Sequence, residues 1–211
     1  MSPAGAGSRR AAIEDVRREE LVTATLETIS ERGFERTTVR DIADAAGVAV
    51  GSVNYYFKSK HDLLRTAVAD SDRRFRERVR TELAAVAGAR AKLERVAEFA
   101  FLPSENVPDW AVFVDFWQQA SRDESFREIF EAANAEWIEM LVDVISQGVE
   151  DGDLVVRGSI PDEAMALAAL IDGLGLHERV TAHIDGETAC RLVRAHIDQL
   201  RARPAASGAR D

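Results

Sequence analysis

The sequence predicts an all-α protein, and two observations indicate this class. Apolar residues recur at spacings of three, four and seven along most of the chain, which is the periodicity of amphipathic helices, and no segment shows a convincing strand pattern. With 46% hydrophobic and 30% charged residues among 211, the chain has enough apolar material for a core and little bias toward disorder. We expect about nine helices: a three-helix N-terminal module, a long connecting helix and a larger helical domain.

Shifts in composition divide the chain into four parts. Residues 1–12 carry Pro3 and a pair of arginines without apolar periodicity, so we expect a flexible basic arm there. Residues 13–60 form the three-helix module, and residues 61–203 form the larger helical domain, which begins with the connecting helix. Residues 204–211 are rich in small side chains and are expected to be a flexible tail.

The N-terminal module carries the start and stop signals of three helices. The first helix ends at Gly33, which suits the left-handed backbone of a helix C-cap. Thr38 and Asp41 have the spacing of a capping box that starts the second helix. A glycine-centred turn at Gly47 and a short third helix over about residues 49–57 follow. Two helices joined by such a turn make a helix-turn-helix, whose second helix can enter the major groove of DNA.

The rest of the chain continues with helical periodicity. A second capping pair, Ser59 and Asp62, starts the long connecting helix. Further patterns predict helices over about residues 90–102 and 110–117, one of almost thirty residues through Phe126 and Val144, and two that start near Pro161 and Glu187.

Charge is distributed unevenly along the chain. The formal net charge is −10, yet residues 1–80 hold 15 Lys and Arg against 13 Asp and Glu, while the remainder holds 12 against 24. This asymmetry favours a polyanionic partner for the N-terminal part and an acidic surface elsewhere that repels DNA. The alternative is an acidic helical protein in which the asymmetry is a chance fluctuation.

The expected third helix has a polar outward face. Val53 and Phe57 are four residues apart and can face the core of the module. The outward groups can contact phosphates or base edges of DNA; they comprise Gly51, Ser52, Asn54 and Tyr55, next to the Tyr56 hydroxyl and the ammonium groups of Lys58 and Lys60. The alternative is that the tyrosines pack on the next helix and the lysines are merely solvated.

Residues 33–48, the Gly51-Ser52 pair and the stretch Tyr55-Tyr-Phe-x-Ser-Lys-x-x-Leu-Leu64 resemble the N-terminal DNA-binding module of the TetR family of bacterial repressors. The downstream helices resemble the ligand-binding and dimerisation part of that family, closest to its BetI-like branch. The resemblance implies an all-α homodimer in which the last two helices pair across a two-fold axis. It also implies a small-molecule effector of unknown identity between the helices of each subunit. The implied operator contacts, mostly with phosphates, are Thr38, Arg40, Ser52, Tyr56 and Lys60.

Three positions of the module depart from the family pattern. Ala49 stands where many relatives have a serine that caps the third helix, which weakens the start of this helix by about 1 kcal/mol. Val50 replaces a residue that is often lysine or polar, so we expect one phosphate contact fewer. Asn54 stands where tyrosine is common, and an asparagine that binds adenine is one outcome there.

Aromatic residues gather between positions 113 and 137, where they can line a cavity for a small molecule. Polar groups on the same or neighbouring helices can orient the ligand, and Asp172 favours a cationic or hydrogen-bonding one. The alternative is that the aromatic stripe is plain helix core. The predicted ligand-binding residues are Phe113, Phe116, Trp117, Phe130, Asn134, Trp137, Asp172 and His177.

The last two predicted helices suit pairing between two copies of the chain. The helix from Pro161 carries small residues that let a neighbouring helix approach closely, and the last helix offers apolar side chains. For Gly173 and Gly175 the alternative is a local break of the helix before a loop. The predicted interface residues are Ala168, Gly175, Leu192, Val193, His196 and Leu200.

Catalytic and metal-binding patterns fail on spacing, so we expect no enzyme, no metal and no cofactor. His177-Glu178 is followed by Thr181 where a zinc protease needs a second histidine, and the four histidines form no cluster. The chain has neither a Gly-x-Ser-x-Gly elbow nor a dinucleotide-binding loop. Cys190 has no partner for an internal disulfide, and a small buried filler fits this position better than a reactive thiol.

No apolar stretch reaches the roughly 18 residues of a membrane span, and the N-terminus lacks an apolar signal core. We therefore expect a cytoplasmic protein without a membrane partner. The sequence predicts a ligand-responsive repressor that binds a palindromic operator in double-stranded DNA as a homodimer. An effector would shift the connecting helix and change the spacing of the two recognition helices from the roughly 34 Å of one DNA turn. The alternative is a helical small-ligand carrier or interaction protein without specific DNA binding.

Overall fold

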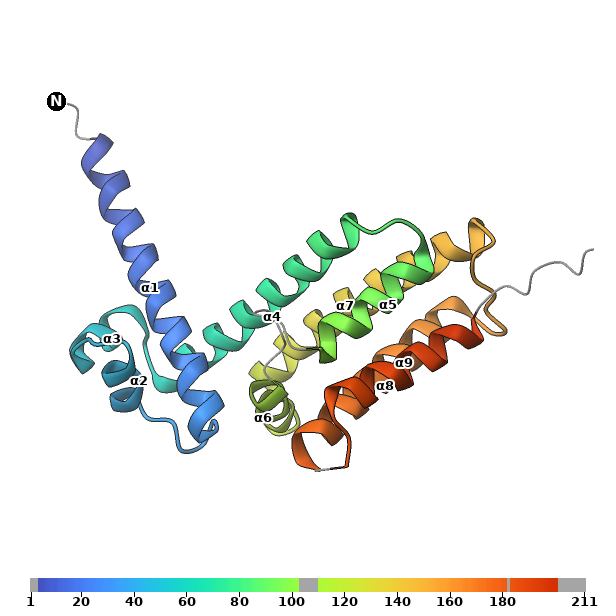
Figure 1. Ribbon diagram of the computed structural model, residues 1–211. Coiled ribbons are helices and arrows are strands. Elements are labelled where there is room, and N and C mark those ends of the chain that lie inside the picture. The colour runs from blue at the N-terminus through green and yellow to red at the C-terminus, as the bar shows by residue number, and fades with distance from the viewer. Residues whose placement is uncertain (1–3, 103–109, 182, 201–211) are drawn as a thin grey trace, which may run out of the picture. The chain divides into compact units, whose positions relative to one another are not determined.

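The computed structural model describes residues 4–102, 110–181 and 183–200, with side chains from residue 14 onward, and within these ranges it contains nine helices and no strand. The predicted all-α class is thereby confirmed. None of the helices in the described ranges is long and apolar enough to cross a membrane. The helices, shown in Figure 1, are α1 (Ala4–Arg32), α2 (Val39–Ala45), α3 (Val50–Tyr56), α4 (Lys60–Ala84), α5 (Ala89–Phe101), α6 (Trp110–Ala120), α7 (Glu124–Glu150), α8 (Ile160–Val180) and α9 (Gly186–Gln199).

These helices form two compact units. The N-terminal unit comprises Met1–Arg74 and Ala111–Phe130, and the C-terminal unit comprises Phe75–Trp110 and Glu131–Asp211. All of α6 after its first residue therefore lies in the unit that contains α1, α2 and α3, whereas the sequence placed it in the larger domain. The reason is apolar packing, because side chains of α6 and of early α7 join the core that α1 and α4 form.

Helix α1 is longer than predicted. It begins at Ala4, within the residues predicted to be a flexible arm, whereas the sequence pattern predicts a helix only from about Ile13. Residues 4–12 are rich in alanine and arginine, which are strong helix formers, and a helix forms there without an apolar stripe. Residues 1–3 and the predicted tail over residues 204–211 lie outside the described residues.

The helix-turn-helix forms with the predicted local signals. Gly33 ends α1 with a φ of 81°, and Gly47 makes the turn after α2 with a φ of 65°. The Thr38 hydroxyl accepts from the Asp41 N–H at 3.2 Å, and the Asp41 carboxylate accepts from the Thr38 N–H at 2.9 Å, so the capping box starts α2. α1 packs on α2 and α2 packs on α3. Their shared core comprises Leu21, Val22, Ala24, Ile42, Ala43, Val53, Phe57, Leu63 and Ala67.

In the C-terminal unit, α5 packs against α8 and α9, which lie side by side in Figure 1. Ser159 caps α8 by accepting from the Asp162 N–H at 3.2 Å, and Pro161 lies in the first turn as predicted. Cys190 of α9 is 2% exposed, and burial raises the pKa of its thiol. The expectation that Cys190 is a buried filler is confirmed.

Helix α8 continues unbroken through Gly173 and Gly175 to Val180, so the alternative of a helix break at these glycines is wrong. Their surroundings differ sharply. A Cβ atom at Gly173 would meet no atom within 4 Å, whereas one at Gly175 would overlap the Trp110 ring. Gly175 is therefore required for the close approach of an indole ring to the α8 backbone.

Candidate functional site

Helix α3 presents the polar face that its sequence predicts. Val53 and Phe57 are 1% and 2% exposed and belong to the core of the module. Gly51, Asn54 and Tyr55 are exposed, Tyr55 by 67%. The apolar side of α3 is thus fixed by packing, while small polar groups and an aromatic hydroxyl face the solvent. Groups of this kind bind phosphates and base edges in a DNA groove.

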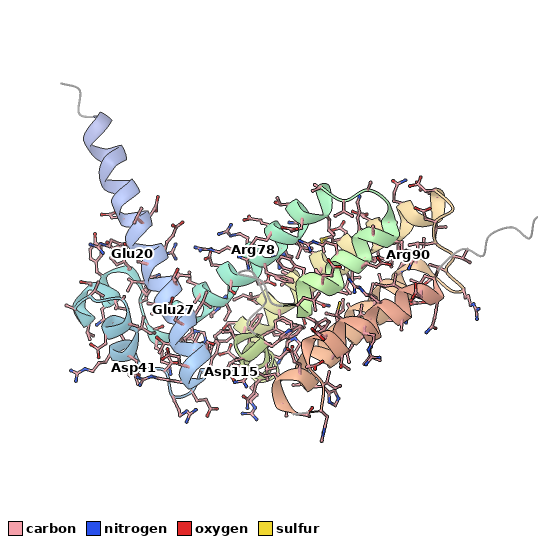
Figure 2. The ribbon with its side chains drawn as sticks, viewed as in Figure 1. Glu20, Glu27, Asp41, Arg78, Arg90 and Asp115 are labelled. Atoms are coloured by element: carbon pink, nitrogen blue, oxygen red, sulfur yellow. The ribbon has the colours of Figure 1, made fainter. Side chains whose placement is uncertain are left out.

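A shallow recess lies beside this face, between α1, the α2–α3 turn and α3. Ser52 and Tyr56 are half-buried and contribute to its wall. Arg17 of α1 also lines the recess and pairs with Glu20, labelled in Figure 2, at 2.6 Å. The complete lining is Arg17, Glu20, Leu21, Ala46, Val48, Ser52 and Tyr56. Arg17 could not be predicted from the sequence as a site residue, because only the packing of α1 on the module brings it to the same recess as Ser52.

Thr38 and Arg40 are exposed at the start of α2. The Thr38 hydroxyl donates to the carboxylate of Asp41, which is labelled in Figure 2, at 2.6 Å, and Arg32 donates to the same carboxylate at 2.8 Å. The hydrogen bonds from Thr38, with Arg32 beside them, hold the pKa of Asp41 below its usual range. A phosphodiester accepts hydrogen bonds but donates none, so the Thr38 hydroxyl must release Asp41 before it can bind one.

Lys60 begins α4 in the same unit. The second predicted cap holds this turn, since the Asp62 N–H donates to Ser59 Oγ and the Lys58 N–H donates to the Asp62 carboxylate, both at 3.1 Å. Lys60 Nζ donates to the Glu35 carbonyl at 3.2 Å. An ammonium group has three donors, so this contact leaves Lys60 able to bind a phosphate oxygen as well.

Four of the predicted ligand-binding residues lie in the N-terminal unit, where their rings are in contact. The centroids of Phe113 and Trp117 are 5.1 Å apart, and Phe130 lies 6.0 Å from both Trp117 and Phe116. Phe116 is 3% exposed and is part of the core of this unit. Trp117 Nε1 is buried, and no acceptor lies within hydrogen-bonding distance of it among the described residues.

The other four predicted ligand-binding residues lie in the C-terminal unit. Trp137 packs against Phe75 with ring centroids 5.7 Å apart. Asn134 is half-buried and His177 is exposed. Asp172, half-buried on α8, forms no hydrogen bond or ion pair with the described part of the chain, and burial raises its pKa to about 7. A carboxylate in such surroundings gains much from a cation that approaches it.

The predicted interface on α8 and α9 needs a correction. Four of its six residues lie in the core of a single chain and cannot offer side chains to a partner: Ala168, Gly175, Val193 and Leu200. Small and apolar residues suit a helix contact within a chain as well as one between chains, which is why the sequence pattern misplaced them. Leu192 is 38% exposed, and His196 is half-buried with its ring 2.7 Å from the Glu163 carboxylate.

The fold and the solvent-facing polar side of α3 define a regulator of the helix-turn-helix class. Residues 21–67 match the family model described as bacterial regulatory proteins, tetR family, and residues 89–202 match the model described as BetI-type transcriptional repressor, C-terminal. The chain belongs to the TetR family, with a C-terminal part of the BetI type, and is a transcriptional regulator of the repressor type rather than an enzyme.

Similar proteins extend over nearly the whole chain. The HTH-type transcriptional regulator BetI of Paraburkholderia phymatum is 29% identical over 197 residues, which cover 92% of this chain and 97% of that protein. A protein from Saccharomonospora viridis, crystallised in complex with choline, has a TM-score of 0.81 at 23% identity and is covered to 98%, against 89% of this chain. A TetR transcription regulator from Haloarcula marismortui has a TM-score of 0.77 at 24% identity, with 89% of this chain and 99% of that chain covered. The two structures share the fold.

Proposed function

We propose that this protein is a ligand-responsive repressor that binds a palindromic DNA operator as a homodimer and is released by a small cationic effector. One observation carries the proposal: α3 is anchored by Val53 and Phe57 and turns Gly51, Asn54 and Tyr55 to solvent. In this arrangement Asn54 contacts a base edge, while Ser52 and the residues that flank α3 contact phosphates.

Exposed apolar side chains on α8 and α9 support the homodimer. Met165 is 49% exposed, Leu176 36% and Val180 68%, and all three lie on α8, while the partly exposed Leu192 lies on the adjacent α9. Large apolar side chains in solvent on two packed helices suit burial against a second copy of the same surface. A two-fold dimer presents two recognition helices, which matches the symmetry of a palindrome.

Asp172 supports a cationic effector. Its carboxylate is half-buried without a described counter-charge, so a bound cation would offset the cost of keeping it ionised. The choline complex of the S. viridis protein shows a small organic cation bound to a protein of this fold. Effector binding in the C-terminal unit would shift α4 and change the separation of the two recognition helices from the roughly 34 Å that one DNA turn requires.

Substitution of Lys60 and of Asn54 is expected to have different effects on duplexes selected from a random library by the purified protein. Lys60→Ala should weaken all duplexes by a similar factor, because a phosphate contact carries no sequence information. Asn54→Ala should change the preference at one base pair by about 1–3 kcal/mol, as expected for the loss of a base contact. Binding titrations with each selected duplex, combined with sedimentation to count the chains bound, give the measurement.

The expected stoichiometry is two chains per duplex. If Asn54→Ala lowers the affinity for all duplexes by the same factor, Asn54 contacts a phosphate and not a base edge. Failure to select any preferred sequence, or one chain per duplex, would overturn the operator proposal.

Arg17→Ala is expected to weaken binding to all selected duplexes by about threefold to tenfold. It should also reduce the slope of log affinity against log salt concentration by about one, because one phosphate contact is lost. The reason is that Arg17 adds a guanidinium group to the recess beside Ser52 and Tyr56. Arg157→Ala removes the same charge from an exposed turn of the C-terminal unit and is the matched control. If the Arg17→Ala and Arg157→Ala variants bind the selected duplexes with equal affinity, Arg17 of α1 does not contact the DNA.

A further inference from the structure

The recess between α1 and α3 has an ion pair in its wall. Arg17 and Glu20 are the oppositely charged side chains there, and Arg17 Nη1 lies 2.6 Å from the Glu20 carboxylate. The Ser52 and Tyr56 side chains belong to the same wall, and the recess has a volume of about 170 Å³. A guanidinium and a carboxylate in contact largely cancel each other's field at a distance. In the free protein the recess therefore attracts a distant phosphate only weakly.

Two other cations of the module keep their charge uncompensated. Arg40 is exposed at the start of α2 and forms no ion pair within the described part of the chain. Lys60 Nζ donates to the Glu35 carbonyl, which is a neutral acceptor and leaves the ammonium charge in place. Such cations attract the phosphates of any DNA sequence and supply non-specific affinity. Arg17 differs from both, because its partner is an anion.

A phosphate must compete with Glu20 for Arg17. Two anions bound to one guanidinium repel each other, so a phosphate that binds in the recess displaces the Glu20 carboxylate from Arg17. The Arg17 and Glu20 side chains are 54% and 49% exposed, which leaves each of them room to turn into solvent. An exposed pair of this kind contributes at most about fivefold to an equilibrium constant, so a phosphate that gains more than this factor separates the pair.

The gain depends on how closely the DNA approaches. A phosphate seated in the recess can accept hydrogen bonds from the hydroxyls of Ser52 and Tyr56 as well as from Arg17. DNA held loosely by exposed cations keeps its phosphates hydrated outside the recess, where they gain little from a neutral pair. Only in the closely docked complex do these contacts offset the cost of releasing Arg17 from Glu20.

We propose that Glu20 withholds Arg17 from loosely bound DNA and releases it to a phosphate that is seated in the recess. Glu20 thereby lowers the affinity for DNA of arbitrary sequence more than the affinity for the operator, and it determines specificity without contacting a base. The inference rests on the proposed function, since it concerns the operator contact beside α3. Glu20 is a positioning residue, because it acts through Arg17.

Binding to two duplexes of equal length and composition tests the proposal in the full-length protein. One duplex is selected from random DNA, and the other is its shuffled sequence. In the wild type, Arg17→Ala should weaken binding to the selected duplex by about threefold to tenfold and change the affinity for the shuffled duplex by less than about twofold. The slope of log affinity against log salt concentration should fall by about one for the selected duplex alone.

Glu20→Gln removes the charge of Glu20 but keeps its length and an oxygen that accepts hydrogen bonds. In this background Arg17 should contact both duplexes. Adding Arg17→Ala should then weaken binding to the shuffled duplex by about threefold to tenfold as well, and lower its salt slope by about one. Glu20→Gln alone should raise the affinity for the shuffled duplex more than for the selected one, and lower the ratio of the two affinities by about twofold or more.

Glu27→Gln is the matched control. Glu27 is exposed on the same helix, labelled like Glu20 in Figure 2, and lies outside the recess. It is about 10 Å from Glu20 along the helix axis, which is roughly one Debye length at 0.1 M salt. Glu27→Gln should therefore change both affinities by less than about twofold and leave their ratio unchanged. Thermal unfolding of each variant verifies that it is folded.

If Arg17→Ala weakens binding of the wild type to both duplexes equally, Glu20 does not withhold Arg17 and the inference is overturned. It is also overturned if the shuffled duplex remains insensitive to Arg17→Ala in the Glu20→Gln background, or if Glu27→Gln has as large an effect as Glu20→Gln. In each of these cases the operator proposal stands. Failure to select any preferred sequence would instead overturn the proposed function, and the specificity role of Glu20 with it.

Discussion

Gly175→Ala is expected to lower the free energy of unfolding by about 1–3 kcal/mol, which corresponds to a fall in Tm of roughly 3–10 °C for a chain of this size. The added methyl group would overlap the Trp110 ring, and this ring has little room to withdraw because it stacks on Phe101. The gain in helix propensity of alanine over glycine offsets only part of that cost. Thermal and denaturant unfolding, repeated at several protein concentrations, separate the effect on folding from any effect on association.

Gly173→Ala is the matched control on the same helix. It makes the same chemical change two residues away, where a Cβ atom meets nothing within 4 Å, so helix propensity alone should raise stability by up to about 1 kcal/mol. A second variant, Trp110→Phe, should reduce the penalty of Gly175→Ala, because a smaller ring leaves space for the methyl group. Equal stabilities of the two alanine variants would contradict the packing argument.

Features that depend on neighbours within a few residues could be predicted from the sequence. The capping box of Thr38 and Asp41, the left-handed turn at Gly47 and the uncapped start of α3 at Ala49 are all confirmed. The outward face of α3 follows from the same logic, since Val53 and Phe57, four residues apart, fix which side of this short helix faces the core. Local hydrogen bonds and periodicity decide these features.

Features that depend on which helix faces which could not be predicted in this way. Periodicity marks Phe116 as buried but does not name its neighbours, and α6 was therefore assigned to the larger domain although it packs with α1 and α4. Val193 and Gly175 have the residue types of an interface, yet both are in the core of one chain. Arg17 joins the recess beside Ser52 only through the packing of α1.

Asp172→Asn is expected to remove a pH dependence of stability between about pH 4 and pH 7. Burial raises the pKa of Asp172 to about 7 from 3.8, so the unfolded chain releases this proton at lower pH than the folded protein. The contribution of Asp172 to stability is therefore fully present below pH 4 and is lost as pH rises through 7. At pH 8 the asparagine variant should be more stable than the wild type by up to about 4 kcal/mol, and at pH 4 the two should be alike.

The same substitution tests the cationic effector, with choline chloride as the probe. A cation that pairs with the ionised carboxylate relieves the cost of its burial, so choline should raise the Tm of the wild type at pH 8, raise it less at pH 5, and leave the Asp172→Asn variant unchanged. Asp143→Asn alters an exposed carboxylate in the same unit and should retain the response. If choline raises the Tm of the wild type and of the Asp172→Asn variant equally, the cation binds at a site that does not include Asp172 of α8. If neither protein responds to choline, choline is excluded as the effector and other small cations become the candidates. If the stability of the wild type does not change with pH in this range, the buried Asp172 carboxylate does not carry the cost of ionisation on which the cationic effector is argued.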